Sequence, residues 1–291
     1  MKNYIFSFFI FTISIALNAQ MSKDFVGKYA DLYLNTTVKP IEKSEQLQIY
    51  FYQNFYLQFD TVGKVLTKEP IGKKKSDFKP FQTGESYSPI SDYSKLSGME
   101  FKVTSVYEES GKYGRYYVLA LKNELLGTIY YEYDTEFSSE LELSVVGSLK
   151  YPEGYWCNKL ESKKDEFTGE ISIKNPYTSI SAEYIYKIIN KSDTTYYLSL
   201  KANGSTVSVD GKGVIILFEN GLKLEKPDEK IDVKVGKNYY DYSCFIRLSK
   251  EDLQVLRKNK ITKYRLYIYD TNVSSFGAES LVGFINCIID K

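Results

Sequence analysis

Five carboxylates near the middle of the chain are the first residues whose types and spacing could do chemistry. They are Glu132, Asp134, Glu136, Glu140 and Glu142. Two carboxyl groups about 5 Å apart, or about 6.5–9.5 Å apart, can hydrolyse a glycosidic bond with retention or inversion. The spacing singles out no one pair, and an extended strand would turn Glu132 away from Tyr131 and Tyr133. The simpler interpretation is a solvated acidic turn, and a carboxylate-based glycoside hydrolase without His is the alternative function.

Aromatic rings are the second candidate, because the chain contains 28 Tyr and 17 Phe but one Trp. A tyrosine offers apolar ring area and a hydroxyl group to a glycan or a protein partner. Tyr also fills sheets by pairing across strands, but so many rings cannot all be buried. The residues that we predict to bind a ligand are Tyr130, Tyr131, Tyr133, Trp156, Tyr267 and Tyr269. For Trp156 a simpler interpretation exists, because a Trp beside a linker packs between two domains.

A basic loop is the third candidate. Three consecutive lysines at 73–75 and Lys79 lie among Gly, Ser and Pro. Such a loop could hold an anionic polysaccharide or a lipid headgroup, although a solvated connection is the simpler interpretation. With a formal net charge of +1, the chain has no overall field to attract a polyanion, so we predict no nucleic-acid partner.

The chain contains no histidine. This excludes Ser-His-Asp and Cys-His nucleophile systems and removes the commonest ligand of zinc, copper and iron. The sequence also has no Walker loop, no GxGxxG and no GxSxG motif. We therefore predict no cofactor, no metal and no nucleotide chemistry.

Three cysteines remain, Cys157, Cys244 and Cys287. An exported chain can keep a disulfide, and an odd number leaves at least one thiol unpaired. Strand alternation would place Cys244 on the same core-facing side as Ile246, and Cys287 on the same side as Ile285. A Cys244–Cys287 disulfide is one interpretation of this pattern, and two buried thiols are the other.

The first nineteen residues have the pattern of a secretory signal peptide. Lys2 precedes an apolar stretch over 5–17, and small residues surround Ala19. We predict cleavage near Ala19, a mature chain that begins at Gln20, and export to the periplasm, the cell surface or the medium. The apolar stretch is shorter than the roughly 20 residues that a membrane span needs. No later segment is long enough either, so we predict no membrane span in the mature chain.

The elements that must position these residues are short strands with turn residues between them, which favours an all-β protein. An N-terminal β domain over 20–160 would form a sheet or small SH3-like barrels, with two related units at 20–70 and 90–150 as one alternative. A C-terminal β-sandwich would cover 161–291, with a domain boundary near 160. Its turns include Asn220-Gly221, one short helix starts after the N-cap Ser249, and the last strand would cover 281–289.

The stretches DEFTGE (165–170), GKGVIILFENG (211–221) and LSKEDLQVLRKNKITKYRLYIYD (248–270) resemble uncharacterised secreted all-β proteins of Bacteroidetes-type bacteria. The resemblance covers the C-terminal half best and implies export and β structure, but no catalytic residues. We therefore expect an exported, non-catalytic protein that binds or scaffolds at the cell envelope. Its partner would be an envelope glycan or an envelope protein.

Overall fold

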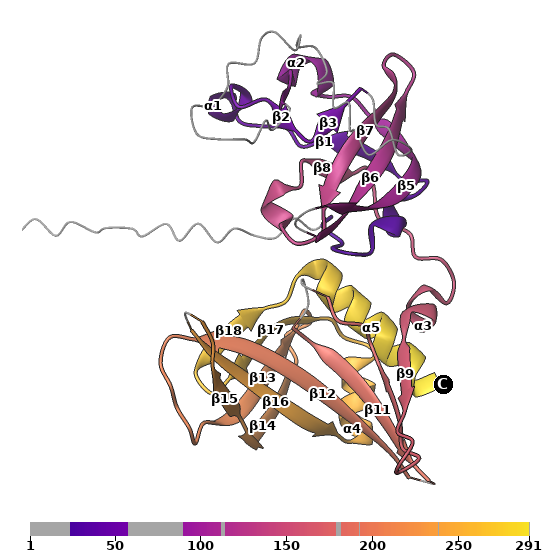
Figure 1. Ribbon diagram of the computed structural model, residues 1–291. Coiled ribbons are helices and arrows are strands. Elements are labelled where there is room, and N and C mark those ends of the chain that lie inside the picture. Colours follow the sequence, from indigo (N-terminus) through magenta and orange to yellow (C-terminus); the bar gives the residue numbers. More distant parts are fainter. Residues whose placement is uncertain are drawn as a thin grey trace, which may run out of the picture.

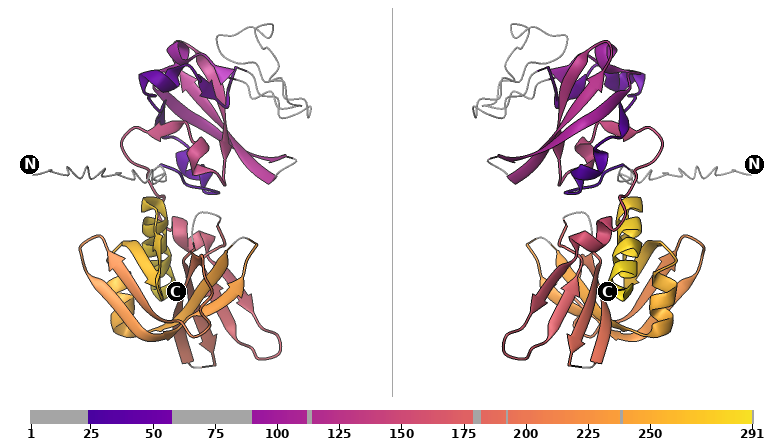
Figure 2. Two further views of the ribbon diagram at one scale, coloured as in Figure 1. Left: turned by 90° about the vertical axis from the view of Figure 1, so that its left-hand side faces the viewer. Right: turned by 90° about the vertical axis from the view of Figure 1, so that its right-hand side faces the viewer.

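A computed structural model describes residues 24–57, 90–111, 114–178, 182–191, 193–237 and 239–290. The predicted signal peptide (1–19) and the basic loop at 73–75 lie outside these residues. Most of the regular structure consists of strands in antiparallel sheets, so the predicted all-β class is confirmed. Figure 1 and Figure 2 show the N-terminal sheet next to the C-terminal sheets, with the helices α3 and α5 at the junction.

The N-terminal half contains one six-stranded sheet of order β3-β7-β6-β5-β1-β8 and a two-stranded sheet of β2 and β4. The strands and helices in this half are η1 (Ala30–Tyr33), β1 (Thr37–Pro40), α1 (Glu45–Gln48), β2 (Tyr52–Gln53), β3 (Phe55–Tyr56), β4 (Ile90–Ser91), α2 (Tyr93–Leu96), β5 (Phe101–Gly111), β6 (Gly114–Asn123), β7 (Gly127–Asp134), η3 (Ser138–Glu140) and β8 (Leu143–Val145). Strand β1 pairs with β5 and β8, and β3 pairs with β7. Among the described residues, strands of both predicted units, 20–70 and 90–150, thus lie in the same six-stranded sheet.

The C-terminal half contains two antiparallel sheets, β15-β16-β12-β11-β10-β9 (sheet C) and β14-β13-β17-β18 (sheet E). Its elements are α3 (Tyr155–Lys159), β9 (Glu161–Lys164), β10 (Ile171–Lys174), β11 (Tyr184–Asn190), β12 (Asp193–Gly204), β13 (Lys212–Phe218), β14 (Lys223–Lys230), β15 (Asp232–Val235), β16 (Tyr240–Leu248), α4 (Lys250–Leu256), β17 (Ile261–Leu266), β18 (Tyr269–Asn272) and α5 (Ser275–Asp290). Strand β12 contacts β17 and β18, and α5 contacts β11 and β17. The two sheets thus face one another, and α5 packs against both.

Two local predictions in this half are confirmed. Helix α4 begins after Ser249, whose hydroxyl accepts from the backbone N–H of Asp252 at 3.1 Å. The Asp252 carboxylate accepts in return from the backbone N–H of Ser249 at 2.9 Å, which completes a capping box. The hairpin turn between β13 and β14 contains Asn220, and Gly221 adopts a φ of +81° that favours glycine.

The predicted last strand over 281–289 is wrong, because this segment lies in the sixteen-residue helix α5. The residues that α5 buries include Leu281, Phe284, Ile285 and Ile288, a spacing of three and four residues that fits one face of a helix. The Ser274 hydroxyl accepts from the backbone N–H of Gly277 at 3.0 Å and caps the first turn.

The predicted Cys244–Cys287 disulfide is wrong for the same reason. Helix α5 packs beside α3, and Cys287 forms a disulfide with Cys157 on α3, with a Cα–Cα distance of 5.1 Å. Cys244 on β16 is a free thiol and is buried. Burial raises the pKa of this thiol to about 12, so the group is protonated and inert at neutral pH.

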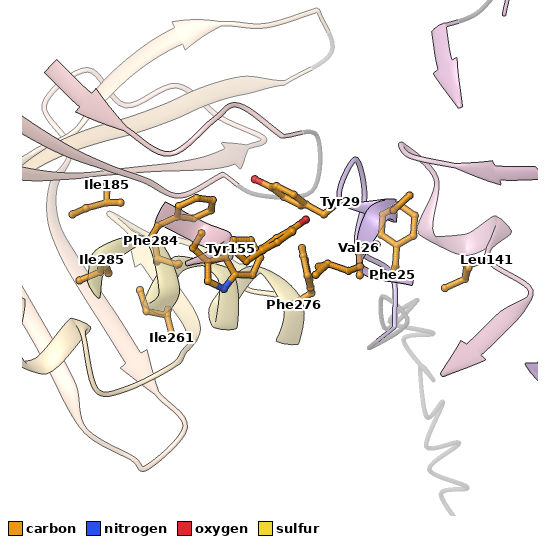
Figure 3. Packing of buried hydrophobic residues seen from close by; sticks show 14 of the residues in the cluster. Phe25, Val26, Tyr29, Leu141, Tyr155, Ile185, Ile261, Phe276, Phe284 and Ile285 are labelled. Carbon is orange, nitrogen blue, oxygen red and sulfur yellow. The ribbon is translucent and has the colours of Figure 1, made fainter. Parts of the chain in front are cut away.

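An aromatic cluster joins the two halves around Trp156. This ring is 7% exposed and lies 5.5 Å from Tyr29 of the N-terminal half and 4.9 Å from Phe284 of α5, between ring centroids. Figure 3 shows Tyr29, Tyr155, Phe276 and Phe284 gathered at this place. The ring of Trp156 thus packs between the halves, as the simpler interpretation expected, and presents almost no surface to a ligand.

Candidate binding face

Three carboxylates of the acidic cluster over 132–142 form hydrogen bonds or an ion pair within the N-terminal half. Glu142 forms an ion pair with Lys43 at 2.5 Å and accepts from the backbone N–H of Gln53. Burial raises the pKa of Glu142, while the hydrogen bond from Lys43 acts in the opposite direction. The Oδ1 atom of Asp134 accepts from the backbone N–H groups that follow it, at 2.6 and 3.1 Å, and so closes a turn. The hydroxyl of Tyr56 donates to Glu132 at 3.2 Å.

Two surface depressions in the described part of the chain lack the paired carboxylates of a glycosidase. One, of about 170 Å³, lies on β13 and β17 and contains Asp270. Hydrogen bonds from Arg265, at 2.6 Å, and from Lys263, at 2.9 Å, lower the pKa of this carboxyl group. The other, of about 420 Å³, lies between the start of β1 and the segment after β8, and its described lining contains Asn35, Lys150 and other residues but no carboxylate.

The six predicted ligand-binding aromatics lie at separate places. Tyr131 and Tyr133 point into the N-terminal core and are 1% and 0% exposed, while Tyr130 lies on the opposite side of β7. The hydroxyl of Tyr131 donates to the carbonyl of residue 140 at 3.2 Å, and that of Tyr133 accepts from the backbone N–H of residue 26 at 3.1 Å. A ligand therefore has no access to these two rings in the folded chain.

Tyr267 and Tyr269 lie at the hairpin between β17 and β18. The ring of Tyr269 packs on that of Tyr242 with centroids 4.6 Å apart, and its hydroxyl lies 2.6 Å from the hydroxyl of Thr206. Tyr267 has a φ of +56° at the turn and is 38% exposed. The structure thus brings Tyr131 near Tyr133 inside the N-terminal core and Tyr267 near Tyr269 at the hairpin, while Trp156 is buried at the junction.

A different set of rings forms a continuous, partly exposed surface on sheet C. It consists of Tyr186 on β11, Tyr197 on β12 and Phe245 on β16, and we call it the aromatic face. Tyr197 and Phe245 stack with their centroids 4.6 Å apart and an angle of 15° between the ring planes. Tyr186 meets Phe245 edge to face at 5.1 Å. Figure 1 shows the parent strands β11, β12 and β16 in the C-terminal half.

Strand alternation explains why these rings share one side. The inward neighbours Ile185, Leu198 and Ile246 are each 0% exposed, and successive side chains of a strand point to opposite sides of the sheet. Tyr186 pairs directly with Tyr197 across β11 and β12. Both are partly exposed.

Phe245 keeps 46% of its surface exposed. Two further rings lie beside the aromatic face, that of the buried Tyr184 and that of the exposed Tyr177. Tyr184 lies beside Ser199 on the same side of the sheet, and the exposed Tyr177 stacks over it at 6.0 Å with an interplanar angle of 10°. Lys201 places its Nζ atom 5.7 Å from the centre of the Tyr184 ring, within reach of a cation–π interaction. Burial raises the pKa of Tyr184 to about 12, so its hydroxyl is a neutral hydrogen-bonding group at neutral pH.

Sequence reasoning missed the aromatic face, although the signal was present. The alternation of β16 assigns Tyr242, Cys244 and Ile246 to the core, which leaves Phe245 outside. A large apolar residue at an outward position of a regular strand indicates an exposed patch. The neighbouring rings belong to strands far away in the sequence, so only the pairing of the strands brings them together.

Within the described residues, no group of three or more His, Cys, Asp or Glu side chains is placed to hold a metal ion. Among the same residues, no helix is both long and apolar enough to cross a membrane. In comparisons with known proteins, no family model, no curated protein and no solved structure matches this chain.

Proposed function

We propose that the chain is an exported, non-catalytic protein of the cell envelope and that the aromatic face binds a glycan. The observation that carries the proposal is the partly exposed group of Tyr186, Tyr197 and Phe245, whose rings contact one another on a regular sheet. A ring held by its neighbours offers apolar area at little entropic cost, and the phenol groups add hydrogen bonds. The C–H faces of sugar rings and their hydroxyls match both features.

The size of the patch favours a glycan over a protein partner. An aromatic side chain has about 150–250 Å² of surface, so the half-exposed Phe245 and the two less exposed tyrosines offer at most about 300 Å². A stable protein interface needs about 800 Å² from each partner, which is more than these rings supply. A few sugar units need much less area. The signal-peptide pattern and the resemblance to secreted proteins support the envelope as the location.

The test is binding of the purified mature chain to a panel of neutral and acidic polysaccharides and to insoluble cell-wall material. The test variants are Tyr197→Ser and Phe245→Ser. Each stacked ring should contribute about 1–2 kcal/mol to binding, so either variant should bind roughly 5- to 30-fold more weakly. Phe167→Ser is the matched control, because Phe167 is fully exposed at the turn between β9 and β10.

Wild-type affinity in both test variants would refute the proposal. So would binding to no polysaccharide and to no cell-wall fraction. Capture of an envelope protein through Tyr197 and Phe245, without any glycan, would assign the aromatic face to a protein partner and refute the glycan assignment. Circular dichroism of each variant checks that sheet C is intact, since both test residues point away from the core.

A further inference from the structure

We propose, on the basis of the function above, that the ligand of the aromatic face is an acidic polysaccharide whose carboxylates bind Arg247. Four residues on adjacent strands form one row across sheet C. Lys174 pairs with Tyr186, Tyr186 with Tyr197, and Tyr197 with Arg247. Two rings thus lie between two cations in a line perpendicular to the strands.

The length of this row suits several linked sugar units. Neighbouring strands lie about 4.8 Å apart, so the three steps from Lys174 to Arg247 cover about 14 Å. A polysaccharide segment that lies across the strands would contact the two tyrosines with its middle and a cation with each end. Ser199 and Phe245 lie in a second row beside the first and widen the platform with one hydroxyl and one ring, while Tyr184, the third member of this row, is buried.

The charges beside the rings favour an anionic ligand. Arg247 is exposed, and no carboxylate among the described residues forms an ion pair with it. Lys201 is also exposed and points to the Tyr184 ring. Lys174 shares its charge with Glu161, which lies 3.4 Å away. The rings are therefore next to three cations and one carboxylate, although the whole chain has a formal net charge of only +1.

Two of the acids elsewhere on sheet C have a lysine near them. Asp241 on β16 lies opposite Lys234 of β15 in the strand pairing. Asp232 lies 3.9 Å from Lys230. Arg247, with which no described carboxylate forms an ion pair, lies beside the aromatic face. A guanidinium group binds a carboxylate through two parallel hydrogen bonds, so Arg247 suits a sugar acid better than a neutral sugar.

The experiment compares polygalacturonate with its methyl ester, because these polymers share one backbone and differ in charge. At low salt the wild-type chain should bind polygalacturonate at least tenfold more tightly than the ester. This preference should decline as salt screens the exposed charges. Arg247→Gln should lose most of the preference while keeping its affinity for the ester, and Lys223→Gln on β14 is the control with the same loss of charge.

Equal affinity of the wild type for both polymers would overturn the inference, as would an unchanged preference in Arg247→Gln. Tighter binding of dextran sulfate than of polygalacturonate would overturn the assignment to carboxylates. In these cases the loss of ester binding in Tyr197→Ser would still uphold the proposed function. If no polymer of any charge binds, the proposed function fails and the inference fails with it.

Discussion

Removal of the Cys157–Cys287 disulfide by a double change to serine should strongly destabilise the chain. The bridge joins residues 130 positions apart and so restricts the unfolded chain over nearly half its length. The loop-entropy relation gives about 5 kcal/mol at 25 °C for a loop of this size, and native bridges typically contribute about 2–5 kcal/mol. We expect a loss of about 3–5 kcal/mol in the free energy of unfolding. In guanidinium chloride the midpoint should fall by roughly 1 M.

Trp156 makes this change easy to follow. It is the only Trp in the chain, it precedes Cys157 directly, and it packs against Phe284 of α5. Its fluorescence should therefore report the loss of contact between α3 and α5. The comparison variant is Cys244→Ala, which keeps the bridge and removes a buried thiol. This variant should cost about 1 kcal/mol, because the cavity is small.

Thiol counting tests the same pairing independently. The native chain should show no reactive thiol, and the unfolded, unreduced chain should show one, which peptide mapping assigns to Cys244. A mapped peptide that joins Cys244 to Cys287 would refute the placement of α5. An equal midpoint for the double variant and the wild type would refute the stabilising role of the bridge.

Three further predictions concern the stability of the fold and the burial of its tyrosines. Gly283→Ala should cost about 1–3 kcal/mol, because a Cβ atom at residue 283 would lie 2.1 Å from the Cδ1 atom of Trp156; an unchanged melting temperature would contradict this packing. Ser249→Ala should cost about 1 kcal/mol through the lost cap of α4, whereas Ser249→Asp should recover most of it, and equal stability of all three chains in urea would contradict the cap. In an alkaline titration, the rings of Tyr133 and Tyr184 should ionise late, since burial raises their pKa, that of Tyr184 to about 12. Because their pKa is raised in the folded state, these tyrosines stabilise the fold at pH values below the ordinary tyrosine pKa near 10, and this stabilisation is lost as the pH rises through the folded-state pKa. Phenolate absorbance should thus rise first in a reversible step and then in a cooperative step that accompanies unfolding. A single step near pH 10 for all tyrosines would contradict the burial of these two rings.

Local patterns in the sequence predicted much of the C-terminal half. The alternation over 240–248 gave the strand and its buried side, and Ser249 with Asp252 predicted the start of α4. These signals depend on neighbouring residues only, so one sequence is enough to see them.

The errors arose where two periodicities compete. Residues 281–289 are apolar at so many positions that both strand and helix spacing can be found, and the cap at Ser274 is the feature that favours the helix. The wrong disulfide followed from this error, because a strand would have turned Cys287 towards β16. The aromatic face depends on which strands are neighbours, and no local pattern contains that information.

Hydroxyl-radical footprinting with polysaccharide prepared from the envelope tests the central claim most directly. Exposed aromatic side chains react, and a ligand lying on them blocks the reaction. We predict protection of Tyr186, Tyr197 and Phe245 in the presence of the polysaccharide, with the fully exposed Phe167 unaffected. Unchanged labelling of the three rings, or protection confined to another surface, would contradict the account.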